Sequence, residues 1–169
     1  NQINALQKLI VCIQIVCIQM ADTSLNENRI GLLIWQTSNL WQSKLRKELS
    51  KYKISFNEYI IIETIYNLSI FSNDISQIDI VKNCFIDKSV VSAKLTQLNK
   101  KKLIKKMAPN DNRSNKLNLT SEGINIIEEI IDDINEIESN IFSKLNEETF
   151  NFTNSLKLLL GKKIRIKAN

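Results

Sequence analysis

The sequence contains no histidine, one proline, three glycines and three cysteines among its 169 residues. Without histidine, the chain lacks the commonest general base and the commonest ligand of transition metals. It also lacks a glycine-rich phosphate loop and a pattern of paired carboxylates, so an enzyme is disfavoured. Few glycines and prolines favour long helices over a sandwich or barrel. We therefore expect a mainly α fold with no catalytic residue, no cofactor and no metal site.

The cysteines are sparse, odd in number and not spaced as metal ligands, which is typical of a reduced cytoplasmic protein. They are Cys12, Cys17 and Cys84. The first two lie in a strongly apolar run, residues 9–20, within an N-terminal extension, residues 1–27. This run is too short to span a bilayer and lacks the small-residue cleavage signal of a secretory leader. We expect no membrane partner. The run is interpreted as a buried helix, a helix covered by a partner, or vector-derived residues.

Charge is distributed unevenly along the chain, although the net charge is only +5. Residues 82–116 hold ten basic and two acidic residues, a net charge of +8. Residues 119–150 hold nine acidic residues and one lysine, a net charge of −8. A polyanion is attracted by the first segment and repelled by the second. The basic segment is therefore the candidate contact surface for nucleic acid, although most charged segments are only solvated faces.

Apolar residues at helical spacing predict one long helix from Glu27 to about Lys53. Ser55 then offers an N-cap, and Glu58, three residues later, completes the pattern of a capping box. An apolar stripe after it predicts a second helix that runs to about Phe71.

Two short helices joined by a tight turn are predicted next, one capped by Ser76 and the other by Asp87. In the second of them, Val91, Leu95 and Leu98 are spaced to face inward. The side chains expected to face outward are small or polar: Lys88, Ser89, Ser92, Ala93, Thr96 and Gln97. This arrangement is typical of a helix-turn-helix.

Two short alternating segments, residues 103–107 and 116–119, flank a turn-forming stretch, residues 109–115. They predict a β-hairpin, or wing, directly after the helix-turn-helix. Thr120 then caps a helix that we expect to extend to about Leu145 with isoleucines along one side. A final helix is expected over residues 147–160.

Residues 55–123 resemble the MarR family of bacterial transcriptional regulators in the order and spacing of their motifs. Residues 87–92 (DKSVVS) are similar to the start of the family's recognition helix, and residues 98–104 (LNKKKLI) lead into the hairpin. Residues 111–113 (DNR) are similar to the Asp-x-Arg of the wing, and residues 119–123 (LTSEG) to the Leu-Thr-x-x-Gly that opens the next helix. The joint occurrence of these motifs at the right separations is what makes the resemblance specific.

The resemblance implies a winged helix-turn-helix with a small β-hairpin wing and flanking N- and C-terminal dimerisation helices. Residues 28–54 would form the first dimerisation helix, residues 55–119 the DNA-binding region, and residues 120–169 the C-terminal dimerisation helices. The apolar faces agree with this, because they are longer than one winged-helix core can cover. We expect a homodimer that presents two recognition helices to successive major grooves of double-stranded DNA.

The resemblance also implies a set of DNA-binding residues. They are Ser76, Gln77, Lys88, Ser89, Val90, Ser92, Ala93, Lys94, Gln97, Lys105, Asp111, Arg113 and Ser114. Arg113 is expected to reach the minor groove, where narrow A·T-rich DNA concentrates negative potential, and Asp111 to orient its guanidinium. The remaining lysines after the recognition helix are Lys100, Lys101, Lys102, Lys106 and Lys116, and several of them are expected to border the DNA backbone. As a structural alternative, Asp111 and Arg113 would be only an ion pair in a surface turn.

Three positions depart from the family pattern. Ala93 stands where the family often has arginine, so base readout should differ. Lys102 stands where glycine is common, and we expect a less tight turn into the hairpin. Lys94 stands at a usually apolar position, where its side chain is expected to extend from the edge of the core toward the DNA backbone.

Four aromatic residues are candidates for a pocket that binds a small aromatic effector: Trp35, Trp41, Tyr59 and Tyr66. Such residues are more often part of a core. Cys84 is interpreted as a small buried residue. Some members of the family sense oxidants through an N-terminal cysteine, but Cys12 and Cys17 precede the first family-like helix, which disfavours that role.

The favoured interpretation is a dimeric, cytoplasmic, sequence-specific regulator, and a repressor more than an activator, that acts by occupying its operator. The alternative is a winged-helix protein-interaction module that has lost DNA binding, which the alanine at position 93 keeps open. A DNA binder should show a steep dependence of affinity on salt, because binding releases counterions.

Overall fold

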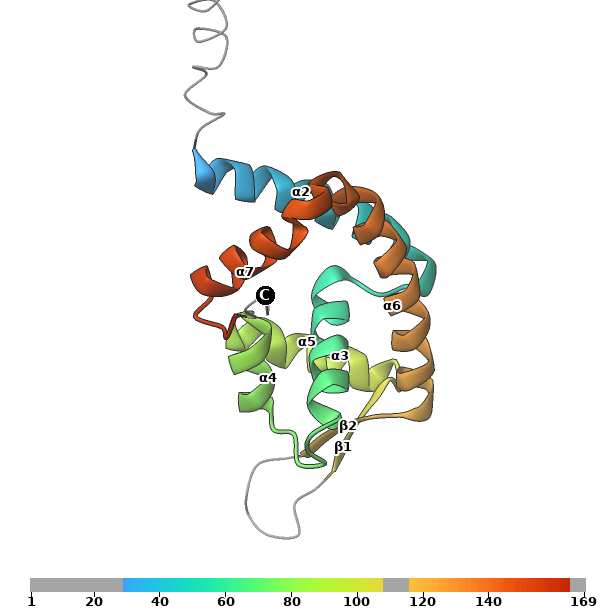
Figure 1. Ribbon diagram of the computed structural model, residues 1–169. Helices are drawn as coiled ribbons and strands as arrows, with labels where there is room; N and C mark the ends of the chain where they lie inside the picture. Colours follow the sequence, from blue (N-terminus) through green and yellow to red (C-terminus); the bar gives the residue numbers. More distant parts are fainter. Residues whose placement is uncertain (1–28, 108–115, 165–169) are drawn as a thin grey trace, which may run out of the picture. The chain divides into compact units, whose positions relative to one another are not determined.

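The computed structural model describes residues 29–107 and 116–164, and its helices and small antiparallel sheet confirm the expected mainly α winged-helix fold (Figure 1). The chain divides between Gln42 and Ser43 into two units. The division falls inside helix α2 (Ile30–Leu49). Within the described ranges, no helix is long and apolar enough to cross a membrane.

In the first unit, α2 leaves several large apolar side chains open to solvent. Ile30 is 71% exposed, Trp35 62% and Leu40 52%. Glu27, where the helix was expected to begin, lies outside the described residues. Exposed apolar side chains at this density are typical of a surface that another molecule covers.

The second unit begins with the end of α2, whose Leu45 and Leu49 are buried. A 3-10 helix, η1 (Ser50–Tyr52), follows, and the chain then turns through Lys53. Helix α3 (Phe56–Ser69) begins with the predicted capping box. The backbone N–H of Ser55 donates to Glu58 Oε2 at 2.8 Å, and the backbone N–H of Glu58 donates to Ser55 Oγ at 3.4 Å.

The helix-turn-helix consists of α4 (Gln77–Cys84) and α5 (Lys88–Lys100), with the predicted N-caps Ser76 and Asp87. Val91, Leu95 and Leu98 are fully buried, as their spacing predicted. Helix α5 packs against both α3 and α4.

The predicted hairpin consists of β1 (Ile104–Met107) and β2 (Lys116–Leu119), which pair antiparallel with Ile104 opposite Leu119. The turn between them, predicted over residues 109–115, lies outside the described residues. A further backbone bond joins the sheet to the segment before α4, where the N–H of Leu117 donates to the carbonyl of Ile75 at 2.8 Å. This bond ties the base of the wing to the start of the helix-turn-helix.

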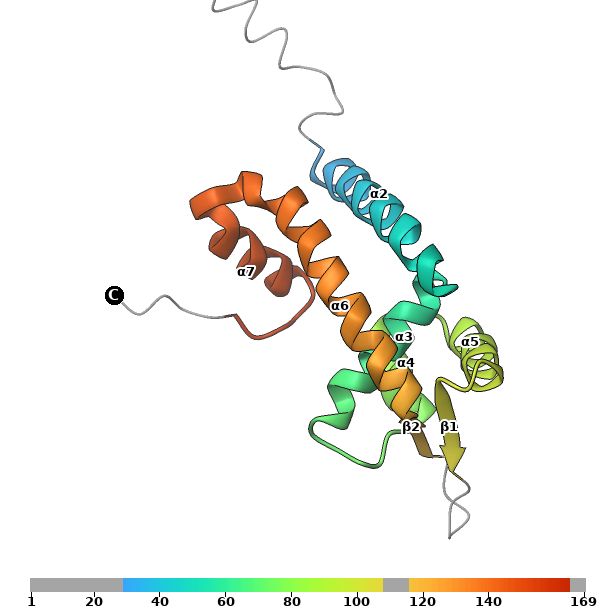
Figure 2. The same ribbon diagram turned by 90° about the vertical axis from the view of Figure 1, so that its right-hand side faces the viewer.

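Helix α6 (Ser121–Phe142) starts after its predicted cap, Thr120, and ends three residues before the expected Leu145. A 3-10 segment, η2 (Ser143–Glu148), contains Asn146 with φ 44° and ψ −120° and leads into α7 (Thr149–Leu159). Figure 2 shows the chain reversing direction at η2, so that α7 runs back from the end of α6.

Candidate nucleic-acid interface

The outer face of α5 is small, polar and open, as the sequence predicted. Lys88, Ser89 and Ser92 are exposed, and so are Ala93 and Gln97. Val90 and Lys94 are half-buried. Because the opposite face is anchored in the core, the exposed face is held rigidly, and it has the size and polarity that suit entry into a major groove.

The side-chain carboxylate of Asp87 caps the N-terminus of α5. Asp87 Oδ1 accepts hydrogen bonds from the backbone N–H of Ser89, at 2.7 Å, and from the hydroxyl of Ser89. The hydroxyl bond, followed by the backbone bond, holds the pKa of Asp87 below its ordinary value. The hydroxyl of Ser89 must therefore leave Asp87 before it can donate to a phosphate or a base.

Ser76 and Gln77 lie at the start of α4, where both are half-buried. The hydroxyl of Ser76 donates to Asp79 Oδ2 at 2.6 Å and accepts from the backbone N–H of Asp79 at 3.3 Å. Asp79 thus completes a second capping box, which the sequence analysis missed although the Ser-x-x-Asp spacing was visible. Ser76 serves first as a cap.

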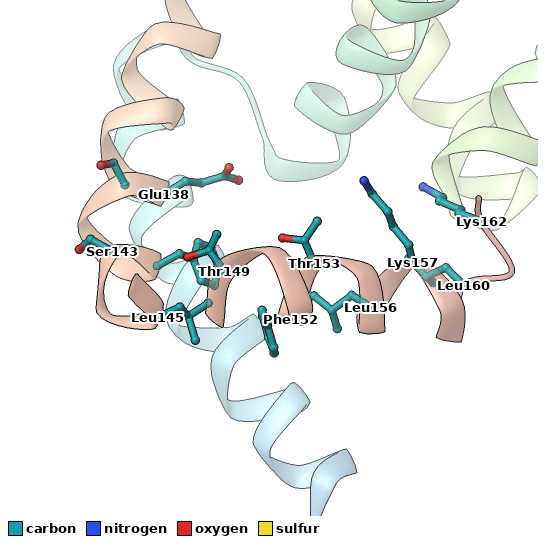
Figure 3. A pocket seen from close by; sticks show the side chains of 12 residues that line it. Glu138, Ser143, Leu145, Thr149, Phe152, Thr153, Leu156, Lys157, Leu160 and Lys162 are labelled. Atoms are coloured by element: carbon teal, nitrogen blue, oxygen red, sulfur yellow. The ribbon is translucent and has the colours of Figure 1, made fainter. Parts of the chain in front are cut away.

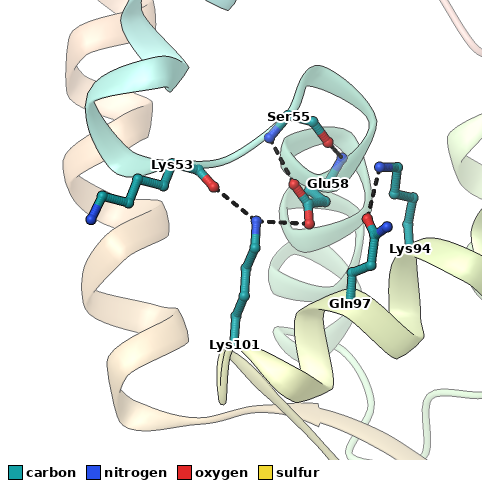
Figure 4. A network of polar contacts seen from close by, with 6 residues as sticks. All are labelled: Lys53, Ser55, Glu58, Lys94, Gln97 and Lys101. Atoms are coloured by element: carbon teal, nitrogen blue, oxygen red, sulfur yellow. Dashed lines mark hydrogen bonds and ion pairs between the residues drawn. The ribbon is translucent and has the colours of Figure 1, made fainter.

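Among the lysines predicted to contact DNA, Lys88 and Lys105 are exposed on α5 and β1. Lys94 does not extend freely, because its ammonium donates to Gln97 Oε1 at 2.8 Å, one turn further along α5 (Figure 4). This bond places an ammonium and an amide side by side, a pair that can offer donors to a phosphate and a base edge together.

Lys101 belongs to the lysines after α5 of which several were expected to border DNA, but its ammonium is engaged within the protein. Its ammonium lies 2.8 Å from Glu58 Oε1 and donates to the carbonyl oxygen of Lys53 at 2.8 Å (Figure 4). The Glu58 side chain is only 3% exposed. The positive charge of Lys101 is therefore used inside the protein to compensate a buried carboxylate.

The ammonium of Lys116 also has a carboxylate partner within the chain. Its ammonium lies 2.5 Å from Asp74 Oδ1, with both side chains on the surface. An exposed ion pair of this kind contributes about 0–1 kcal/mol, so a phosphate can compete with Asp74 for the ammonium. The basic charge counted from the sequence thus overstates what α5 and the hairpin present to a polyanion.

Three of the predicted DNA-binding residues, Asp111, Arg113 and Ser114, lie outside the described residues, so their contacts remain predictions. The base of the wing is described, and it is fixed to α6. The hydroxyl of Thr120 donates to the carbonyl of Lys102 at 2.7 Å, and the backbone N–H of Thr120 donates to the carbonyl of Leu103 at 3.0 Å.

The turn from α5 into the hairpin is tighter than we expected from the lysine at position 102. Lys102 adopts the left-handed conformation, with φ 60°. The backbone N–H of Leu103 donates to the carbonyl of Leu98 at 3.1 Å, and that of Lys102 donates to Asn99 at 3.0 Å. These bonds form a Schellman motif. The expectation was wrong because the bonds and the burial of Leu103 outweigh the steric cost of a left-handed lysine.

The four aromatic candidates for an effector pocket have different surroundings. Tyr59 is 3% exposed, and burial followed by a hydrogen bond to Glu63 raises its pKa. Tyr66 is half-buried, and its hydroxyl donates to Glu128 Oε1 at 3.0 Å. Trp35 is exposed and Trp41 half-buried. The assignment of these residues to a pocket stays a prediction.

A groove of about 590 Å³ lies between the end of α6, η2 and α7 (Figure 3). Its walls are largely apolar and include Phe142, Phe152 and Leu156, with the ammonium-bearing Lys157 at the edge. None of the four aromatic candidates lines it. Beyond the groove, Leu158 and Leu159 are 60% and 71% exposed.

No family model matches the chain. The chain is 30% identical over 136 residues to the HTH-type transcriptional regulator PecS of Dickeya dadantii, covering 80% of this chain and 75% of PecS.

Its fold is similar to that of MepR of S. aureus in a complex with DNA, with a TM-score of 0.70 and 24% identity over 80% of this chain and 97% of MepR. It is also similar to BpsR of Bordetella bronchiseptica, whose DNA binding is regulated by 6-hydroxynicotinic acid. There the TM-score is 0.68 with 18% identity, over 79% of this chain and 95% of BpsR.

Proposed function

The chain belongs to the MarR family of transcriptional regulators, and on this premise we propose that it represses transcription as a cytoplasmic homodimer that occupies an operator in double-stranded DNA. The observation that carries the proposal is the face of α5. It exposes Lys88, Ser89, Ser92 and Gln97, while Val91 and the two leucines behind it are fully buried. A rigid helix with a small polar face is the element that reads base edges in a helix-turn-helix.

Each subunit contributes a second positive element, the base of the wing. Lys105 and Lys106 are exposed on β1. Lysines at this position can neutralise phosphates beside the groove that α5 enters. Arg113, which the family motif assigns to the wing, would add the minor-groove contact that this motif predicts.

Dimerisation is supported by apolar surface that the single chain leaves uncovered. In the first unit it is carried by α2, with Ile30 and Trp35. In the second unit it comprises the groove between α6 and α7 and the exposed Leu158 and Leu159 (Figure 3). A second copy would bury these surfaces in a self-complementary interface, as two-fold symmetric oligomers do.

The proposal extends to control by a small aromatic acid, supported by the regulation of BpsR by 6-hydroxynicotinic acid. The aromatic residues predicted for such a pocket are Trp35, Trp41, Tyr59 and Tyr66. A ligand that binds the DNA-free state more tightly than the DNA-bound state would lower operator affinity. At saturation, the free energy of operator binding would weaken by the difference between the ligand's binding free energies for the two states.

The experiment that tests the proposal is selection of bound fragments from the source genome, followed by affinity measurements on the selected site across a salt series. A repressor dimer should bind the site far more tightly than unrelated duplex, with a steep fall in affinity as salt increases. Sedimentation at micromolar concentration should report a dimer.

The alternative is a winged-helix interaction module without DNA binding. Two observations favour it: the ammonium groups of Lys101 and Lys116 already have carboxylate partners within the chain, and position 93 is alanine. Binding that is weak and independent of salt would support the interaction module and reject the repressor.

A further inference from the structure

The C-terminal end of α5 is held by a contact that the family resemblance did not indicate. Lys101 is the C-cap of α5, and its ammonium bridges two groups on another part of the fold. It lies 2.8 Å from Glu58 Oε1, on α3, and donates to the carbonyl oxygen of Lys53 at 2.8 Å, before α3 begins. Figure 4 shows the side chain reaching from α5 to the turn between η1 and α3.

Glu58, the first partner, is itself immobilised. Its second oxygen, Oε2, accepts from the backbone N–H of Ser55 at 2.8 Å, and its side chain is 3% exposed. Burial alone would raise the pKa of Glu58, but the hydrogen bonds from Lys101 and Ser55 outweigh it and hold the pKa below its ordinary value. Within the described ranges, no buried side-chain nitrogen or oxygen lacks a hydrogen-bond partner. The carboxylate is therefore charged, fixed and paired with one ammonium.

Lys53, the second partner, presents its carbonyl from a defined turn. Its backbone is left-handed, with φ 55°, and its N–H donates to Ser50 at 3.1 Å. The N–H of Ile54 donates to the carbonyl of Leu49, the last residue of α2, at 3.2 Å. Through this turn the ammonium of Lys101 is attached to the end of the helix that is proposed to dimerise.

The apolar contacts of α5 do not replace this attachment. Val91, Leu95 and Leu98 hold the helix against the core through apolar burial, which is non-directional. A charged hydrogen bond to a fixed carboxylate and a fixed carbonyl is directional. An α-helix of 13 residues is about 20 Å long, so a small shift at its C-terminus displaces its N-terminal end within the groove.

We propose that Lys101 is a positioning residue for DNA recognition, which orients α5 against the turn that ends the dimerisation helix and so sets the separation of the two recognition helices in the dimer. The inference rests on the proposed function. It explains how a residue that does not contact DNA can still determine which operators the dimer binds. Half-site spacing is the property of the DNA that it controls.

The test uses the full chain, the selected operator, and operators whose half-site separation is changed by one base pair in either direction. The principal variant is E58Q/K101M, which removes both charges, leaves no buried carboxylate unpaired, and keeps an acceptor for the N–H of Ser55. Lys101→Arg is the conservative variant. Lys144→Met removes an exposed lysine of η2 that is not among the residues expected to contact DNA, and it is the matched control.

We expect the wild-type protein to prefer the natural separation and E58Q/K101M to lose about five- to tenfold of that preference. Its salt slope and its affinity for unrelated duplex should stay unchanged, because Lys101 contacts no phosphate. Lys101→Arg should restore the preference, and Lys144→Met should retain it. Circular dichroism is the control for folding.

An unchanged spacing preference in a folded E58Q/K101M would overturn the inference and leave the network a local stabilising contact. A salt slope lowered by about one unit would also overturn it, because Lys101 would then contact a phosphate. Failure of the proposed function is distinguishable, since the wild-type protein itself would then show no salt-dependent DNA binding, and both conclusions would fall.

Discussion

A β-carbon built on Gly123 would stand 2.1 Å from the backbone carbonyl oxygen of Leu103. Leu103 leads from the recognition helix into the wing, and Gly123 lies in the first turn of α6. The same junction is held by Thr120, whose Oγ1 accepts from the N–H of Gly123 at 3.0 Å. The glycine of the Leu-Thr-x-x-Gly motif is thus required for the close approach of α6 to the base of the wing.

Replacing Gly123 with alanine should therefore destabilise the protein. The clash is with backbone, which cannot rotate away, and overpacking of this kind costs about 1–3 kcal/mol, more than the gain of up to about 1 kcal/mol in helix propensity. Urea unfolding measures the change. Gly31→Ala is the matched control, because nothing lies within 4 Å of its added methyl group, and it should be neutral or slightly stabilising. Equal unfolding midpoints for Gly123→Ala and the wild-type protein would refute the close approach.

Replacing Lys102 with glycine should have the opposite effect and stabilise the protein. Its φ of 60° is left-handed, a conformation that costs a residue with a side chain about 1 kcal/mol and glycine much less. Lys102→Gly should raise the free energy of unfolding by a few tenths to about 1 kcal/mol, the gain being reduced by the greater freedom of glycine in the unfolded chain. Lys100→Gly, at the last residue of α5, should instead lower the free energy of unfolding, by up to about 1 kcal/mol. Thermal unfolding of the two variants measures both changes in stability. A destabilised Lys102→Gly variant would show that the lysine side chain itself is needed.

Glu58 should make stability depend on acid pH. Its pKa in the folded protein lies below the ordinary value of 4.5. The unfolded chain therefore binds the proton first as pH falls. The stabilisation is complete above pH 4.5 and is lost as pH falls through the lowered pKa of the folded state. Glu58→Gln should flatten the fall of unfolding free energy between about pH 5 and pH 3. Parallel pH profiles for the two proteins would contradict this.

The starts of the helices could be predicted because capping is local. Ser55, Ser76, Asp87 and Thr120 each accept from a backbone N–H within three residues, and the sequence displays such spacings directly. The buried face of α5 could be predicted for the same reason, since helical periodicity determines it.

The partners of the lysines could not be predicted, because they depend on distant parts of the chain. Lys101 and the carbonyl of Lys53 are 48 residues apart in sequence, and Lys101 stands in a run of three lysines that all look solvated. The end of α6 at Phe142 was also missed. Its isoleucines continue to Ile141, and no glycine or proline marks the stop, so only the backbone at Asn146 shows the break.

The wing carries a prediction that depends on the family motif. Arg113→Ala should weaken operator binding by about 1–3 kcal/mol and relax the preference for A·T pairs at the flanks, because the guanidinium is expected in a narrow minor groove. Quantitative binding to the selected operator and to versions with G·C flanks measures both effects, and circular dichroism confirms the fold. If affinity and flank preference are both retained, Arg113 does not enter the minor groove.

The exposed lysines provide the last prediction, since they distinguish phosphate anchoring from a solvated basic face. Lys88 and Lys105 are both exposed and lie on the two elements proposed to meet DNA, α5 and β1. A phosphate contact carries no sequence information, so Lys88→Ala and Lys105→Ala should each weaken specific and unrelated binding alike.

Each of these two substitutions should also lower the slope of log affinity against log salt by about one unit, because one counterion fewer is released. Lys144→Ala, which removes an exposed lysine from η2, is the matched control and should leave the slope unchanged. If the slopes of all three variants equal that of the wild-type protein, α5 and β1 do not anchor phosphates, and the winged-helix interaction module becomes the better account of this chain.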